Sequence, residues 1–464
     1  MATEATIGAS SLEECSPALV RSGWLDVCLK RVNEPVDGAS LAVFRILFGC
    51  VMAFAMVRLL VKGWVRELYL APAFHFTWEW FPWVKVLPGW GMYGLVAGLA
   101  LAALGVAAGW RHRFCAALFF SGFTYLELID QTTYLNHYYL VSLLSGLLIF
   151  LPADAKWACA PRREPGGMVP VWAVWLLRFQ VGAVFFFAGL AKLNGDWLLE
   201  AQPMRIWLAA RSDLPWIGPF LAKVWVAYAA SWAGALYDLF IPFLLLRSRT
   251  RPFACVAVIV FHGMTAVLFN IGMFPWIMMV AALIFFPPEG FGRFLAKGKH
   301  PESTGGKRTS TNIRGGQLQR AGLMMLGCYV LIQIALPLRP FLYPQQGAWD
   351  GRGFNFSWRV MLVEKTGYVE FFAVSPESRS KERLRVDHLI TPRQKVMMAQ
   401  DPDMIRQMAC RLAKDLSASE RERVEIHVSS YATINGHPSQ RLIRAGIDLT
   451  GPLPADWIVP FKAK

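Results

Sequence analysis

The sequence predicts a polytopic α-helical membrane protein of about nine transmembrane helices, followed by an outer-side β-rich soluble domain with one helix. Of the 464 residues, 55% are hydrophobic and only 17% are charged, whereas soluble proteins carry about 25% charged residues. Runs of roughly twenty apolar residues recur through the first three quarters of the chain, and each is long enough to cross a bilayer. We expect a polar cytoplasmic segment at 1–38, a membrane domain at 39–342 and an extracytoplasmic domain at 343–464.

The first segment is polar and has no hydrophobic core, so we expect no cleavable signal peptide. Two stretches between the spans, Trp64–Trp90 and Asp196–Lys223, are predicted to be interfacial or re-entrant. A Gly- and Ser-containing stretch at 289–320 is predicted to be a flexible basic loop. The expected spans are 41–61, 90–108, 114–128, 136–151, 170–190, 224–246, 253–271, 275–286 and 323–342.

Lysine and arginine gather in alternate loops, which orients the membrane domain. The loops at 111–113, 156–163, 247–251 and 289–320 fall on one side if the spans alternate, and this side is cytoplasmic by the positive-inside rule. The net charge of +15 is therefore a topology signal, and no nucleic-acid partner is expected. The polar corner Asp130–His137, Lys192 and the turn Asn270–Pro275 then lie on the outer side.

The C-terminal domain shows the alternation of apolar and polar residues that is typical of strands. Strands are predicted at Trp358–Val363, Tyr368–Ala373, Val424–Ser430 and Arg441–Ile447. Apolar residues recur at helical spacing over Asp403–Leu416, which predicts one amphipathic helix.

Lys192 ends an almost unbroken apolar run that begins at Val181 and includes Phe185. Two interpretations are open. The ammonium group extends past its own stem to lipid headgroups or water, or it faces the protein interior, loses its hydration and acts as a neutral base.

Several other polar residues lie at membrane depth, where they are costly and indicate function. Asn136 and His137 begin a span, where a helix cap or an interfacial contact is the simpler explanation for each alone. His262 lies inside an apolar span, and Asp238 with Arg178 is interpreted as a structural ion pair.

The residues Asn136, His137, Lys192 and Asn270 share the outer side without an acid at the core of the set. A lysine among apolar residues and neutral hydrogen-bonding partners is suited to act as a base.

The eight cysteines are scattered, and no two form a CxxC pair. This spacing argues against a zinc site and against a thiol oxidase. No metal is expected.

Three motifs in order resemble the vitamin K-dependent γ-glutamyl carboxylase family, whose membrane part is the HTTM domain. They are Leu128–Leu140, Phe187–Trp197, and Phe261–Met264 with Leu268–Phe274. The resemblance continues from Tyr343 to Trp358 and through Asp403–Leu416 and Val424–Ile447, so it covers most of the chain. It suggests a bacterial homologue in the inner membrane, with its active site toward the periplasm.

The resemblance implies an enzyme that uses vitamin K hydroquinone or menaquinol, O2 and CO2, and a Glu-containing peptide or protein as substrate. A lysine at the position of Lys192 deprotonates the hydroquinone, and oxygenation then yields a base strong enough to remove a γ-proton from Glu. The carbanion captures CO2, and the quinone leaves as its epoxide. Asn136 and His137 match the family's Asn-His pair, which binds the quinone oxygen and orients or protonates the reacting centre, and they join Lys192 as catalytic residues.

By the same resemblance, we expect the cofactor to contact His262, Asn270, Phe185 and Asp130. A water-excluding pocket in the bilayer would protect the reactive species. Membrane lipid is the other expected partner, and the sequence leaves open whether the protein is a monomer or a dimer.

The chain departs from the family pattern at three places. Ala191 replaces the first of two adjacent lysines, so desolvation has to contribute more to the basicity of Lys192. A family histidine is replaced around Val363 and Glu364, and Cys410 has no cysteine partner in the segment Trp64–Trp90.

Two other functions stay open at this point. One is a quinol epoxidase or oxidoreductase without Glu carboxylation, which the change near Glu364 allows. The other is a membrane lipid-binding or transport protein with Lys192 and His137 as ligand contacts, although no internal repeat of the kind found in transporters is evident.

Overall fold

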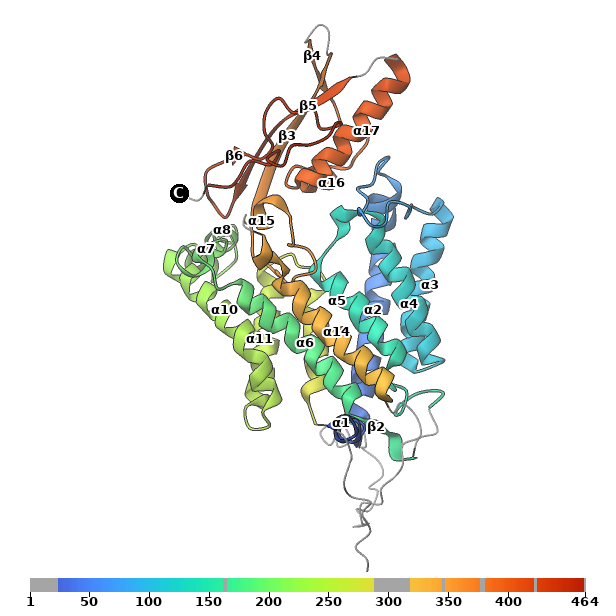
Figure 1. The fold of residues 1–464 in the computed structure, drawn as a ribbon. Helices are drawn as coiled ribbons and strands as arrows, with labels where there is room; N and C mark the ends of the chain where they lie inside the picture. Colours follow the sequence, from blue (N-terminus) through green and yellow to red (C-terminus); the bar gives the residue numbers. More distant parts are fainter. Residues whose placement is uncertain are drawn as a thin grey trace, which may run out of the picture.

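A helical body carries a smaller sheet domain at one end (Figure 1). The computed structural model describes residues 24–161, 165–287, 318–343, 347–375, 380–420 and 424–462. Most of the polar N-terminal segment and of the predicted basic loop, residues 1–23 and 288–317, lies outside the described residues.

Six described helices are long and apolar enough to cross a membrane. The other three predicted spans are also helical, but they are shorter or less apolar: α4 (His112–Ile129), α5 (Asn136–Phe150), and α12 (Phe274–Ala282) with the turn Leu283–Phe285. The predicted number of nine spans is therefore not confirmed. The six long helices are α2 (Ala39–Val61), α3 (Gly89–Ala108), α6 (Val171–Ala191), α10 (Val224–Leu246), α11 (Arg251–Leu268), and α14 (Arg320–Leu338) with its extension Arg339–Leu342.

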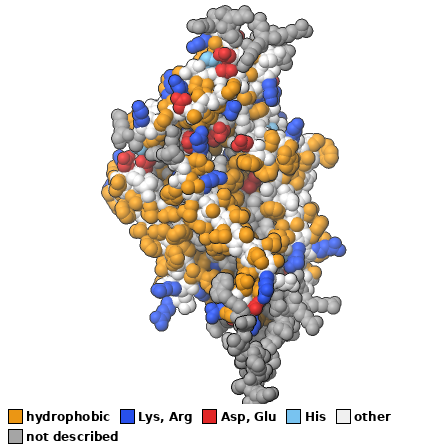
Figure 2. Space-filling model, viewed as in Figure 1, with side chains coloured by type: hydrophobic (Ala, Val, Ile, Leu, Met, Phe, Trp, Pro, Cys, Tyr) orange, Lys and Arg blue, Asp and Glu red, His pale blue; other side chains and the backbone are white. Residues whose placement is uncertain are grey.

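The body presents a broad band of hydrophobic side chains, with charged side chains gathered toward its two ends (Figure 2). Large apolar residues such as Leu101, Phe253 and Val267 are mostly exposed. An exposed apolar surface of this extent is unfavourable in water, so the band supports an integral membrane protein.

Short elements connect the long helices. The helix α1 (Trp24–Val32) precedes a two-stranded pairing of β1 (Pro35–Asp37) with β2 (Met168–Pro170). The predicted interfacial stretch from Asp196 to Lys223 forms three short helices, which are α7 (Gly195–Leu198), α8 (Met204–Ala209) and α9 (Gly218–Leu221).

The C-terminal domain is an antiparallel sheet of order β4-β3-β5-β6 that packs against helices α16 (Pro392–Met398) and α17 (Pro402–Glu420). Strand β3 pairs with β5 along ten residues, and alternate residues of β5 are buried, as the predicted period of two requires. The strands are β3 (Lys365–Val374), β4 (Lys381–Leu384), β5 (Glu425–Ile434) and β6 (Gln440–Arg441).

The structure corrects three details of the predicted C-terminal domain. Residues 358–363 form no strand, and the described domain has the helices α15 (Gly347–Asp350) and α16 in addition to α17. The last predicted strand shrinks to the two residues of β6. Helix α16 has a capping box between Thr391 and Gln394, a local signal that the sequence interpretation overlooked.

The segment Trp64–Trp90, which the sequence predicts to be interfacial, also contacts the C-terminal domain. It begins with a π-helical turn (Arg66–Leu70), and Phe76 is fully buried in the core of the C-terminal domain. This segment therefore joins the two domains.

Candidate functional site

Lys192 follows the last residue of α6, and its side chain points into the protein. Only 5% of the residue is exposed. Its Nζ donates hydrogen bonds to Asp238 Oδ2 at 2.8 Å, to Val360 O at 3.2 Å and to Ala188 O at 3.3 Å. The side chain of Lys192 therefore faces the protein interior and does not extend to lipid headgroups or water.

The partner of Lys192 corrects two sequence interpretations. Asp238 forms its ion pair with Lys192, not with Arg178, and an acid therefore does lie at the core of the site. Arg178 instead donates its Nε to Ile284 O at 3.0 Å and stacks over Trp175. The sequence could not show this pairing, because Asp238 and Lys192 are 46 residues apart on different helices.

Gly189 allows α6 and α10 to approach closely beside this ion pair. A Cβ atom on Gly189 would lie 2.5 Å from Leu239 N, which real Cβ atoms do not tolerate. The glycine one turn before Lys192 thus brings Asp238 within reach of the amine.

Lys192 opens into a cavity of about 800 Å³, here called the Lys192 cavity. Its lining is almost entirely apolar, apart from Lys192, Asp238, His262 and Thr265. His262 Nδ1 lies 3.0 Å from Val258 O and the ring is 5.9 Å from that of Phe185, which also lines the cavity. Phe185 and His262 thus share the Lys192 cavity.

Asn136, His137 and Asn270 line a different cavity of about 770 Å³, here called the His137 cavity. His137 is buried, whereas Asn270 is exposed and accepts a hydrogen bond from Arg211 Nη2 at 3.3 Å. The predicted residues are therefore divided between two neighbouring cavities.

One wall separates the two cavities. Phe274 lies between the two histidines, with its ring centroid 5.9 Å from that of His137 and 6.0 Å from that of His262. The residues that line both cavities are Phe269, Ile271, Phe274, Val360 and Met361.

The segment Arg359–Met361, here called the strap, contacts both sets of site residues. Val360 O accepts from Lys192, and Arg359 O accepts from Asn136 Nδ2 at 3.3 Å. Trp358 and Met361 have φ angles of 55° and 48°, a left-handed conformation that is uncommon for residues other than glycine. Sequence reasoning missed the strap, because alternating apolar residues there predict a strand.

Asp130 lines neither cavity, although it lies within the described part of the chain. Its Oδ1 accepts from the backbone N and the hydroxyl of Thr132 at 2.8 and 2.7 Å. Its Oδ2 accepts from Gln394 Nε2 at 2.7 Å and lies 3.0 Å from His75 Nδ1. This placement does not support the prediction that Asp130 contacts a cofactor.

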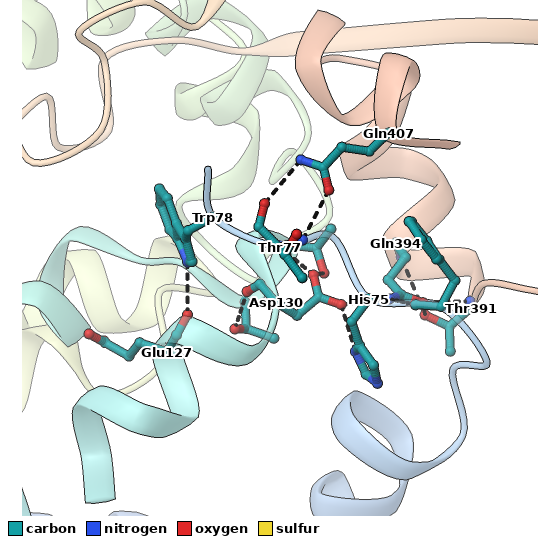
Figure 3. A network of polar contacts seen from close by, with 11 residues as sticks. His75, Thr77, Trp78, Glu127, Asp130, Thr391, Gln394 and Gln407 are labelled. Carbon is teal, nitrogen blue, oxygen red and sulfur yellow. Dashed lines mark hydrogen bonds and ion pairs between the residues drawn. The ribbon is translucent and has the colours of Figure 1, made fainter. Parts of the chain in front are cut away.

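Figure 3 shows that Asp130 is the centre of a polar network between the domains. Gln407 of α17 makes two hydrogen bonds of 3.0 Å with the backbone of Thr77, and Trp78 Nε1 donates to Glu127 O. The network joins the segment Trp64–Trp90, the α4–α5 corner and the C-terminal domain. It fixes the corner from which Asn136 and His137 project.

Cys410, which the resemblance places at a disulfide position, is a free thiol in the structure. Its Sγ lies 3.9 Å from Leu449 O.

Two family models together match most of the chain. The HTTM domain model matches residues 33–289. The model of the vitamin K-dependent gamma-carboxylase lumenal domain matches residues 318–464. No solved structure matches the chain.

Proposed function

Since the chain belongs to the vitamin K-dependent γ-carboxylase family, we propose that it couples oxygenation of a reduced vitamin K to carboxylation of peptide Glu. The product would be γ-carboxyglutamate, and the quinone would leave as its epoxide. The observation that carries the proposal is the buried amine of Lys192, which faces an apolar cavity and has a carboxylate partner at 2.8 Å.

The Lys192 cavity fits a reduced naphthoquinone. Its aromatic and aliphatic lining suits an apolar ring and tail, and Lys192 and His262 are the polar groups available to the two ring oxygens. When bound, reduced vitamin K together with O2 supplies a stronger base than any side chain can provide.

We assign to Lys192 the role of accepting the proton from the hydroquinone hydroxyl. The Asp238 carboxylate then stabilises the ammonium group of Lys192, because Asp238 Oδ2 and Lys192 Nζ are in direct contact beside a largely apolar cavity. The same enclosure protects a strong base and a carbanion from protonation by solvent.

We assign the Glu-containing substrate to the His137 cavity. Asn136 and His137 line this cavity on the far side of the shared wall, where they are placed to orient the acceptor side chain or exchange protons with it. Asn270 lines the rim of the same cavity, and its exposure suits contact with an entering peptide better than with a buried ring.

We further propose that the C-terminal domain lies on the outer side of a bacterial inner membrane. The Lys- and Arg-rich loops at 111–113 and 247–251 support this orientation, because they connect helices at the end of the body away from the sheet domain (Figure 1).

The test is incorporation of radiolabelled CO2 into a Glu-containing peptide by membranes that also receive reduced vitamin K, with epoxide measured in parallel. Wild type should form both products, and Lys192→Ala should form neither. Lys223→Ala is the matched control, because Lys223 is an exposed lysine at the start of α10 and should be dispensable.

The outcomes separate the candidate functions. Epoxide without label, over a range of peptides, would favour a quinol epoxidase that has lost carboxylation. Neither product from correctly folded wild type would contradict the enzyme proposal and favour lipid binding or transport.

A further inference from the structure

The His137 cavity is lined by five acidic or basic side chains, counting histidine, that the steps above leave largely unused. Two of them, Arg58 and Arg393, are arginines, and they come from different domains. Arg58 belongs to α2 of the membrane domain, and Arg393 belongs to α16 of the C-terminal domain. The acidic and basic residues of the lining are Arg58, Glu67, Glu127, His137 and Arg393.

Neither arginine forms an ion pair with any described carboxylate. The Arg58 guanidinium carbon lies 4.8 Å from the ring centroid of Trp64, a cation–π contact that fixes the group and leaves donors free. Other arginines of the C-terminal domain differ, since Arg383 pairs with Glu370 at 2.6 Å and Arg444 with Asp456 at 2.5 Å.

The two acids of the lining do not neutralise these arginines by direct contact. Glu127 accepts a hydrogen bond from Ser142 Oγ at 3.1 Å, and Glu67 is exposed on the π-helical turn after α2. The cavity therefore offers two guanidinium groups to an anion that enters it.

We propose that Arg58 and Arg393 form the subsite for the carboxylate of the acceptor Glu, which rests on the proposed carboxylase function. A guanidinium binds a carboxylate through parallel N–H donors, so two of them hold and orient one side chain strongly. Met52, Met56 and Phe123, which line the same cavity, contact the apolar part of the peptide.

The position of the subsite fits its role. The His137 cavity shares the wall of Phe274 and Met361 with the Lys192 cavity, so an acceptor held at the arginines is next to the quinone site. Gln394, the neighbour of Arg393, is tied to Asp130 and to Phe74 O. Arg393 therefore enters the site only when the C-terminal domain is docked.

A peptide is favoured over an anionic lipid headgroup as the occupant. Arg393 comes from the soluble domain and is exposed at the end of the helical body, where a peptide arrives from water. Asn136 and His137 also line the cavity, and a lipid phosphate bound there would keep the acceptor side chain away from them.

The experiment compares a fluorescent pentapeptide with a central Glu and its Gln counterpart, bound to the purified full-length protein in neutral-lipid nanodiscs. Wild type should bind the Glu peptide at least about tenfold more tightly, because the arginines engage its carboxylate with charge-assisted hydrogen bonds. Arg58→Gln and Arg393→Gln should each remove most of this difference, and Arg393→Lys should retain part of it. Arg66→Gln and Arg385→Gln are matched controls, since both arginines are exposed and line neither cavity.

Turnover supplies an independent readout. In Arg58→Gln and Arg393→Gln, the KM for the Glu peptide should rise about tenfold or more, while the KM for reduced vitamin K stays within about twofold of the wild-type value. Equal binding of Glu and Gln peptides by wild type would overturn the subsite. So would unchanged peptide binding in the variants together with reduced binding of anionic lipid. A protein that discriminates the peptides but forms no product would retain the subsite and reject the carboxylase function.

Discussion

The ion pair between Lys192 and Asp238 makes a quantitative prediction for Asp238→Asn. The substitution keeps the shape of the side chain and one hydrogen-bonding oxygen but removes the negative charge. Lys192 Nζ and Asp238 Oδ2 are 2.8 Å apart, and both side chains are at most 10% exposed. A hydrogen bond to a charged group contributes about 1.5–3 kcal/mol, and removing one partner of a buried pair costs about 3–5 kcal/mol.

We take about 2–3 kcal/mol for the stabilisation of the Lys192 ammonium group that Asp238→Asn loses, because asparagine still accepts a hydrogen bond. The loss falls on the state in which Lys192 carries the proton, because only the ammonium group needs the counter-charge of Asp238. The rate of epoxide formation should therefore fall about 30- to 160-fold at saturating reduced vitamin K. The assay is the initial rate of epoxide formation by purified protein in nanodiscs.

Two controls separate chemistry from folding. Asp37→Asn breaks an ion pair with Lys156 whose side chains are 38% and 26% exposed, and a pair of this kind contributes at most about 1 kcal/mol, so activity should persist. The double variant Lys192→Ala/Asp238→Asn should unfold at a higher temperature than Lys192→Ala, which leaves a buried carboxylate alone. A folded Asp238→Asn protein with at least half of the wild-type rate would refute the assigned role of Asp238.

Two further predictions concern the C-terminal domain. Asp130→Ala removes the acceptor of Gln394 and Thr132, so we expect limited proteolysis of this domain to become at least tenfold faster, whereas Asp387→Ala, at an exposed ion pair, should have little effect. Burial lowers the pKa of Lys365 to about 8. Because its pKa is higher in the unfolded chain, the folded domain should gain stability, up to about 3 kcal/mol, as the pH rises from 8 to 10.5. Thermal unfolding at each pH measures this gain, and an equal rise in Lys365→Met would contradict it.

The sequence was sufficient to place the long membrane helices and the two main strands because both depend on local patterns. Apolar length predicts the six long helices, and alternation predicts β3 and β5, which the structure confirms. Lys192 stands out because it is the one cation in a long apolar stretch, and the structure buries it as the interior interpretation requires.

What the sequence could not predict depends on contacts between distant segments. The partner of Lys192 is on another helix, and Arg393 reaches the His137 cavity from 335 residues beyond Arg58 in a different domain. Residues 358–363 alternate like a strand, but the burial of Trp358 against Tyr139 outweighs strand pairing there. At residues 358–363, tertiary packing therefore outweighs the local preference for a strand.

The strap explains why the two matched domains have to act as one unit. Its carbonyl groups accept hydrogen bonds from Lys192 on one side and from Asn136 on the other. Val360 and Met361 contribute to the wall between the cavities, although they belong to the C-terminal region of the chain. A left-handed backbone at Trp358 and Met361 is unfavourable by itself, so the surrounding packing has to hold it. Docking of the C-terminal domain therefore completes both cavities at once.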